Sequence, residues 1–137
     1  MNHIIPKNPK IIDLPKIGSL DKGYISFIQV NDLLPFYPKR VYWIYGVTKD
    51  IKRGNHYHKK LEQLIICLNG KVDINIENLK GDKKNYTLDK PSKALYVPSG
   101  YWREIHYKKN SMLLCVASEI YDENDYVRDY KKFKNIS

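Results

Sequence analysis

The strongest pattern in the chain is Arg53-Gly54-Asn55-His56-Tyr57-His58-Lys59-Lys60-Leu61-Glu62-Gln63-Leu64-Ile65-Ile66-Cys67-Leu68-Asn69-Gly70. Side chains alternate along a strand, so an extended His56–His58 segment places both imidazoles on one face and Tyr57 on the other. The apolar run from Leu64 to Leu68 predicts a buried strand, and Asn69-Gly70 after it is typical of a β-hairpin turn. A same-face histidine pair beside a buried strand indicates a functional site held by a barrel.

Length and composition predict one globular domain, residues 1–137. The chain is long enough to form a core without disulfides or metals, and 42% of its residues are hydrophobic. Seven prolines and seven glycines divide it into many short segments, and we find no internal repeat. Cys67 and Cys115 each lie in an apolar run, so we expect free, buried thiols in a reducing compartment.

The net charge of +9 comes almost entirely from lysine, because the chain has only four arginines among its 24 basic residues. The lysines are scattered through loops and turns, which favours a solvated surface over a nucleic-acid interface. We therefore expect no nucleic-acid partner. Arginine suits bidentate phosphate binding. The few arginines are thus worth locating: Arg40, Arg53, Arg103 and Arg128.

The N-terminus and the hydropathy pattern bear on localisation. Residues Met1 to Leu14 are interrupted by Pro6 and Pro9 and contain no apolar core, so we expect no signal peptide. No apolar run approaches the length of a membrane span. These features favour a cytoplasmic protein without a membrane partner.

Alternating and apolar segments predict nine or ten short strands and little helix. The segments are Lys10–Leu14, Tyr24–Val30, Arg40–Val47, His56–His58, Glu62–Leu68, Val72–Glu77, Tyr86–Leu88, Ala94–Val97, Trp102–Tyr107 and Met112–Ala117. We expect the last two to pair across a short turn, and the spacing of Tyr126, Val127 and Tyr130 predicts a short C-terminal helix or turn. The fold class is all-β, and a jelly roll fits best.

The spacing His56-x-His58-x-x-x-Glu62 resembles the first motif of the cupin superfamily, many of whose members bind a metal there. In the second motif, Pro98-Ser99-Gly100-Tyr101-Trp102-Arg103, the fourth ligand position holds Arg103, a cation that cannot coordinate a metal. We therefore expect neither a metal nor another cofactor. An open three-ligand site remains the alternative.

Longer segments resemble the sugar 3,4-ketoisomerases that act on dTDP-4-keto-6-deoxyglucose. These segments are Lys39–Ile44, Arg53–Gln63, Trp102–His106 and Ala117–Tyr126. The resemblance runs from about Lys10 to Phe133 and implies a metal-free cupin jelly roll (a double-stranded β-helix barrel) that makes 3-keto sugars for later amination. It also implies a homodimer, and the early strands could be exchanged between its subunits.

Moving a ketone from C4 to C3 requires a proton taken from C3, an enediol, and a proton returned at C4. Histidine titrates near neutral pH and can do this without a metal. The resemblance assigns His56 and His58 as the catalytic pair, in an order the sequence leaves open, and places Tyr42 at the family's active-site tyrosine.

Other residues are expected to bind the substrate or support the histidines. We expect Arg53 to hold the diphosphate, Glu62 to orient an imidazole, and Trp102 either to stack on thymine or to cover the core. His106, Tyr121 and Tyr126 are interpreted as packing residues.

Two positions depart from the family pattern. Ile17 stands where the family usually has arginine, with Lys16 beside it as a replacement cation, and Arg103 stands where histidine is common. Arg103 is a second candidate to supply the cation that Ile17 lacks. Either departure would fit a different substrate or lost activity.

The sequence thus favours a cytoplasmic isomerase of a dTDP-linked 4-keto-6-deoxyhexose that serves surface polysaccharides such as O-antigen lipopolysaccharide. For the product we favour the galacto over the gluco configuration at C4. The alternatives are a metal-dependent cupin enzyme and a non-catalytic nucleotide-sugar binding module.

Overall fold

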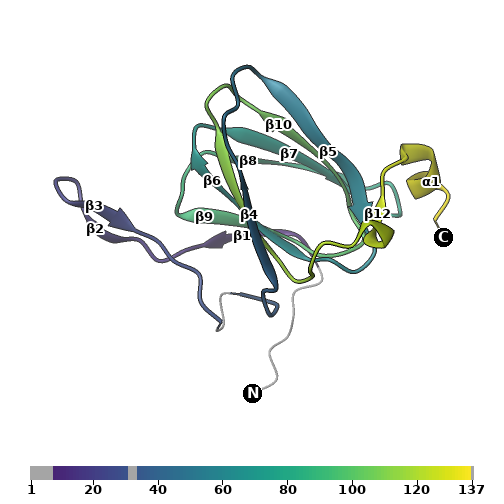
Figure 1. The fold of residues 1–137 in the computed structure, drawn as a ribbon, viewed down its shortest axis with the longest axis horizontal. Helices are drawn as coiled ribbons and strands as arrows, with labels where there is room; N and C mark the ends of the chain where they lie inside the picture. The colour runs from purple at the N-terminus through teal and green to yellow at the C-terminus, as the bar shows by residue number, and fades with distance from the viewer. Residues whose placement is uncertain (1–7, 31–33, 137) are drawn as a thin grey trace.

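The computed structural model describes residues 8–30 and 34–136, and in them two five-stranded sheets face each other (Figure 1). In spatial order, the first sheet contains β1 (Lys10–Asp13), β9 (Lys93–Val97), β6 (Gln63–Asn69), β11 (Met112–Ala117) and β4 (Arg40–Ile44). The second contains β12 (Tyr126–Val127), β5 (Ile51–His58), β10 (Trp102–Tyr107), β7 (Val72–Glu77) and β8 (Lys83–Leu88). Neighbouring strands are antiparallel, and the architecture is the predicted cupin-type jelly roll.

The main core fills the space between the two sheets. Strand β6 is buried on both of its faces, which explains its unbroken apolar sequence. Ile65 and Cys67 point into the main core. Leu64 and Ile66 point to a second cluster on the outside of the first sheet, where Phe36 packs. Cys67 and Cys115 are free, buried thiols, as predicted.

The Asn69-Gly70 turn does not form the predicted hairpin. It carries the chain from β6 in the first sheet to β7 in the second. Gly70 has a φ of +77°, and a Cβ atom there would lie 2.9 Å from the Cα of Ser111. Glycine is therefore required by both the backbone conformation and the close approach of another turn.

The predicted pairing of Trp102–Tyr107 with Met112–Ala117 is also wrong. Strand β10 pairs with β5 and β7 in the second sheet, whereas β11 pairs with β4 and β6 in the first. A turn sequence indicates that the chain reverses direction, but it does not determine which sheet the next strand joins. In a jelly roll that choice depends on long-range packing.

The N-terminal segment forms a hairpin arm that projects away from the sheets (Figure 1). The arm consists of β2 (Ile17–Ser19) and β3 (Gly23–Ile25), so the strand predicted over Tyr24–Val30 is shorter than expected. Several apolar side chains of the arm are exposed: Ile17 at 60%, Leu20 at 93% and Ile25 at 66%.

The C-terminal segment closes one end of the second sheet. A 3₁₀ helix (Glu123–Asp125) leads into β12, and the predicted short helix follows as α1 (Tyr130–Lys134). Phe133 of α1 packs against Tyr57 and Trp102 on the outer face of that sheet. No helix in the described part of the chain is long and apolar enough to span a membrane.

Candidate active site

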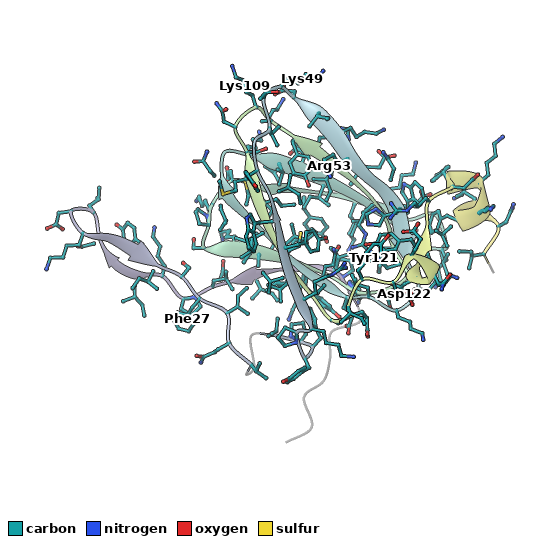
Figure 2. The ribbon with its side chains drawn as sticks, viewed as in Figure 1. Phe27, Lys49, Arg53, Lys109, Tyr121 and Asp122 are labelled. Atoms are coloured by element: carbon teal, nitrogen blue, oxygen red, sulfur yellow. The ribbon has the colours of Figure 1, made fainter. Side chains whose placement is uncertain are left out.

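A cavity of about 490 Å³ lies where β4 and β5 face the C-terminal segment. Its polar lining comprises Arg40 and Tyr42 from β4, Arg53 and His56 from β5, and Tyr126 and Arg128 from the segment around β12. Figure 2 shows Arg53 on the barrel, well away from the arm that leads to Phe27. Three of the four arginines thus line one cavity, in a chain whose other basic residues, apart from Arg103, are lysines.

A β-bulge brings Arg53 and His56 to the same face of β5. Residues three apart on a regular strand point to opposite faces. Here the register with β10 shifts, so that Ile105 opposes Arg53 and Arg103 opposes His56. The extra residue lies at Gly54-Asn55, and both have positive φ values, +89° and +56°. Glycine and asparagine tolerate this conformation best, so the local sequence supports the bulge.

The two histidines lie side by side, as predicted from their spacing. Their ring centroids are 4.7 Å apart in an edge-to-face arrangement. The ring of Tyr126 packs on both, at 5.1 Å from His56 and 4.4 Å from His58. His56 lines the cavity, whereas His58 lies behind it and is only 1% exposed. Of the two imidazoles, only that of His56 faces the cavity.

Asp125 orients the deeper imidazole. Its carboxylate lies 3.0 Å from His58 Nδ1 and also accepts hydrogen bonds from the backbone N–H groups of Lys60 and Leu61. A carboxylate only accepts, so Nδ1 carries the proton. The Nε2 atom of His58 is buried without a hydrogen-bond partner and keeps its lone pair.

Burial and the nearby Arg103 guanidinium keep both imidazoles neutral. Burial, and then the charge of Arg103, lower the pKa of His56 to about 3. The same causes, in the same order, hold the pKa of His58 far below its usual range. Neutral imidazoles with free lone pairs are proton acceptors at neutral pH.

Tyr42, Gln63 and Arg103 form a hydrogen-bonded chain beneath the cavity. Gln63 Nε2 lies 2.5 Å from the Tyr42 hydroxyl, and the Arg103 guanidinium donates to Gln63 Oε1. Arg103 also donates to the carbonyl of Tyr101 at 3.2 Å. Burial raises the pKa of Tyr42 well above its usual value, so its phenol is neutral.

Four residues predicted to bind substrate or support the histidines lie outside the cavity lining. The Glu62 carboxylate bonds the Tyr96 hydroxyl, and the role expected for it is filled by Asp125. Trp102 packs among Tyr130 and Phe133 on the opposite face of the second sheet from Arg103, so it covers that face. Arg103 is 1% exposed and lies beneath the cavity.

The fourth such residue is Lys16, on the segment leading into the arm. Its ammonium lies 4.2 Å from the centroid of the Tyr24 ring, and it lines a different groove beside the first sheet. Ile17 is on the arm as well. Within one chain, neither residue is part of the histidine site.

Sequence reasoning missed several residues of the site: Arg40 and Gln63 beneath or beside Tyr42, and Asp125, Tyr126 and Arg128 after the last long strand. A signal was present for four of them. Asp125 and Tyr126 end the family-like segment Ala117–Tyr126, and Arg40 and Arg128 are two of four arginines. Gln63 ends the family-like segment Arg53–Gln63 in the same way, but its residue type gives no chemical signal, because a glutamine beside an apolar run is ordinary.

The donor set does not match a metal centre. Within residues 8–30 and 34–136, no group of three or more His, Cys, Asp or Glu side chains is arranged to hold a metal ion. The carboxylate of the cupin motif, Glu62, is bonded to Tyr96 rather than directed at the histidines. Imidazole, phenol and guanidinium groups around one cavity in a cupin-type jelly roll define a proton-transfer site suited to an anionic substrate.

The comparisons with known proteins agree with this class. The family described as "FdtA: WxcM-like, C-terminal" matches residues 7–137. A TDP-4-oxo-6-deoxy-α-D-glucose-3,4-oxoisomerase of Aneurinibacillus thermoaerophilus is 38% identical over 126 residues, which cover 91% of this chain and 89% of that protein.

Solved structures give the same result. QdtA, a sugar 3,4-ketoisomerase from Thermoanaerobacterium thermosaccharolyticum in complex with TDP, is 39% identical with a TM-score of 0.85, over 94% of this chain and 93% of that one. A variant of QdtA in complex with TDP-4-keto-6-deoxyglucose is 39% identical with a TM-score of 0.86, over 95% and 94% of the two chains. The chain belongs to the sugar 3,4-ketoisomerase family, a family of sugar-nucleotide isomerases.

Proposed function

We propose that this protein converts dTDP-4-keto-6-deoxy-D-glucose to a dTDP-3-keto-6-deoxyhexose, as a single cupin domain that needs no metal. The observation that carries the proposal is the neutral His56 imidazole at a cavity rimmed by three arginines. The substrate class is supported by the relatives, one of which was solved with TDP-4-keto-6-deoxyglucose. A 3-keto sugar is a substrate for amination, so we place the reaction in the cytoplasmic synthesis of deoxyaminosugars for surface polysaccharide.

The arginines bind the diphosphate in this proposal. Arg40, Arg53 and Arg128 present their guanidinium groups around the cavity, and guanidinium forms paired hydrogen bonds with phosphate oxygens. Arg128 is held in place by Glu123, at 2.7 Å from Nε, and stacks over Tyr126 at 4.2 Å. This arrangement leaves the sugar to extend toward His56 and Tyr42.

Two side chains, His56 and Tyr42, account for every proton that the reaction moves. His56 takes the C3 proton while Tyr42 gives its hydroxyl proton to the C4 oxygen, which produces the enediol. The imidazolium then returns a proton to C4, and Tyr42 recovers its proton from the C3 hydroxyl as the new ketone forms. His58 lies behind His56, in ring contact with it, and Asp125 fixes its orientation.

The number of imidazoles at the cavity supports one product configuration. Only His56 of the pair lines it, so the same group that removes the C3 proton returns one to C4 on the same face of the ring. In the glucose configuration the C3 hydrogen lies on the face that carries the C4 hydrogen of a galacto sugar. We therefore assign the galacto product. Protonation from the opposite face would give the gluco product.

The arm supports a homodimer with exchanged N-terminal hairpins. Its exposed Ile17, Leu20 and Ile25 have no cover within the described part of the chain. A groove of about 750 Å³ runs between the segment that carries the arm and the outer face of the first sheet, with Val41, Leu114 and Val116 in its lining. In a two-fold dimer the arm of each copy would cover the groove of the other, because both copies carry the same arm and the same groove.

Proton NMR of the purified protein with dTDP-4-keto-6-deoxyglucose in D2O tests the activity. We expect a 3-keto sugar with solvent deuterium at C4, at a rate unchanged by excess chelator. The coupling of the C4 proton to the C5 proton, read in ordinary water, separates galacto from gluco. Absence of product would refute the activity on this substrate, and loss of turnover on metal removal, with recovery on metal addition, would favour the metal-dependent alternative.

His56→Asn is the matched variant for this assay, with His106→Asn, on the outer face of β10, as its control. The first substitution should abolish turnover and leave dTDP binding intact, and the second should change neither. A protein that binds dTDP tightly but shows no turnover in its natural form would be a binding module.

A further inference from the structure

Gln63 occupies a position between the buried cation and the cavity phenol. It lies at the start of β6, is only 2% exposed, and contacts Arg103 through its oxygen and Tyr42 through its nitrogen. We infer that Gln63 is a positioning residue that directs the hydroxyl proton of Tyr42 into the cavity, toward the substrate oxygen. The inference rests on the proposed function, in which Tyr42 is the acid.

The direction of these hydrogen bonds is fixed by Arg103. A guanidinium group has five N–H donors and no acceptor, so the group facing it must be the amide oxygen of Gln63. The amide NH2 then necessarily faces Tyr42, and an amide NH2 only donates. The oxygen of Tyr42 is therefore an acceptor in this bond. The usual ambiguity between amide oxygen and nitrogen is resolved by the chemistry of the neighbour.

The proton of Tyr42 must therefore point elsewhere. The other polar neighbour of the hydroxyl is the thiol of Cys115, a weak acceptor, because burial raises its pKa to about 11 and keeps it uncharged. Tyr42 itself lines the cavity. A ketone or enediolate oxygen bound there is a far stronger acceptor than a thiol and takes the phenol proton.

Arg103, at the far end of these hydrogen bonds, cannot reverse their direction. Arg103 is buried, and although burial lowers its pKa to about 10, it stays protonated at neutral pH. It is anchored by a second hydrogen bond, to the carbonyl of Tyr101. The hydrogen bonds from Arg103 to Gln63 and from Gln63 to Tyr42 therefore keep the same donor and acceptor throughout turnover. This prepares Tyr42 as a donor before substrate arrives.

Two substitutions of similar shape separate this role from simple packing. Gln63→Glu keeps the bond to Arg103 but presents a carboxylate oxygen to Tyr42, which turns the phenol proton away from the cavity. Gln63→Met removes both bonds but leaves the phenol free to donate to substrate. We expect kcat to fall about 100-fold or more in Gln63→Glu, and by less than about tenfold in Gln63→Met, with KM nearly unchanged in both. A purely structural role predicts the reverse order, because Gln63→Met loses more contacts.

A double-substitution cycle tests whether Gln63 acts through Tyr42. In a Tyr42→Phe background, Gln63→Glu should reduce kcat no further. The inference would be overturned if the kcat reductions of Tyr42→Phe and Gln63→Glu multiplied in the double variant, or if Gln63→Glu alone kept full activity. An inactive natural protein would instead refute the proposed function.

A readout independent of turnover is the 13C NMR signal of Tyr42 Cζ in protein labelled at that carbon, assigned by its absence in Tyr42→Phe. Donation to a carboxylate moves the phenol toward phenolate character, so Gln63→Glu should shift the signal downfield. An unshifted signal would contradict the polarity assigned to the chain. This measurement needs no substrate and also decides the case if the Gln63→Met variant does not fold.

Discussion

At the scale of single residues, the site depends on which groups can only donate and which can only accept. Asp125 can only accept, so it sets the tautomer of His58 at a distance of 3.0 Å. Arg103 can only donate, so it sets the orientation of Gln63. The tautomer of His58 and the orientation of Gln63 are therefore set before a substrate binds.

Replacing Asp125 tests the first of these contacts. Asp125→Asn leaves one oxygen acceptor and must turn its amide NH2 against an N–H donor, either that of Lys60 or those of His58 and Leu61. The imidazole then loses its fixed orientation, so kcat should fall about tenfold or more. Steady-state kinetics on the dTDP-sugar measures the effect. Asp129→Asn is the matched control, because Asp129 caps α1 and contacts neither histidine. It should leave kcat unchanged, because asparagine also caps a helix N-terminus; equal losses of kcat in both variants would contradict a specific role for Asp125.

Replacing Arg53 tests the diphosphate site. Arg53→Gln removes a charge-assisted contact at the cavity, so the Kd for dTDP should rise about tenfold. Isothermal titration calorimetry at two salt concentrations measures the change, which should shrink at high salt. Lys52→Gln is the control, because the adjacent Lys52 pairs with Glu104 at 3.6 Å instead of lining the cavity. Equal effects of the two substitutions would indicate a general charge effect.

At the scale of elements, two irregularities position the site. The bulge at Gly54-Asn55 turns Arg53 to the same face as His56, which regular alternation would prevent. The turn at Gly70 carries the chain between sheets, so β6 can bury both of its faces. A regular two-stranded hairpin at that turn would leave β7 in the wrong sheet.

The close approach at Gly70 gives a stability prediction. Gly70→Ala should lower the free energy of unfolding by about 2–4 kcal/mol, because its Cβ would lie 2.9 Å from Ser111 Cα at a φ of +77°. Gly46→Ala, at a φ of +73° with nothing within 4 Å, should cost about 1 kcal/mol. Denaturant unfolding of both variants gives the comparison. Similar losses would show that the backbone conformation matters and the contact does not.

At the scale of the whole molecule, the arm defines the proposed assembly. Ile17 and Ile25 are opposite each other in the hairpin and are 60% and 66% exposed. The double substitution Ile17→Glu and Ile25→Glu should convert a dimer to a monomer in light-scattering measurements, because two charges per subunit would be buried in the interface. Ile120→Glu, at a side chain 68% exposed in the segment after β11, should leave the dimer intact. A dimer that survives the arm variant would refute the exchanged-hairpin arrangement.

The two neutral histidines predict how the whole protein responds to pH. An unfolded imidazole has a pKa of about 6.5, whereas that of His56 is lowered to about 3 and that of His58 also lies far below its usual range. Below about pH 6.5 the unfolded chain therefore binds more protons than the folded one. The free energy of unfolding should fall as pH drops below that value and gain nothing from these residues above it.

The pH dependence of kcat should also reflect the protonation of these two imidazoles. While the protein stays folded they remain unprotonated, so kcat should show no acidic limb near the ordinary histidine pKa of about 6.5. Initial rates and denaturant unfolding between about pH 5 and 8 test both statements. Replacing His56 and His58 with asparagine should flatten the stability profile. A kcat that halves near the ordinary histidine value would contradict the buried, neutral pair.

The sequence alone determined the fold class, the histidine pair and the family, because period-two alternation, apolar runs and motif words are properties of neighbouring residues. His56, His58 and Tyr42 were predictable for that reason. Only the tertiary structure decided the partners of these residues. Asp125 reaches His58 across 67 positions of sequence and Gln63 reaches Tyr42 across 21, and no local pattern encodes such contacts. Long-range packing also decides the bulge that places Arg53 beside His56 and the sheet that each strand joins. Local turn signals specify neither.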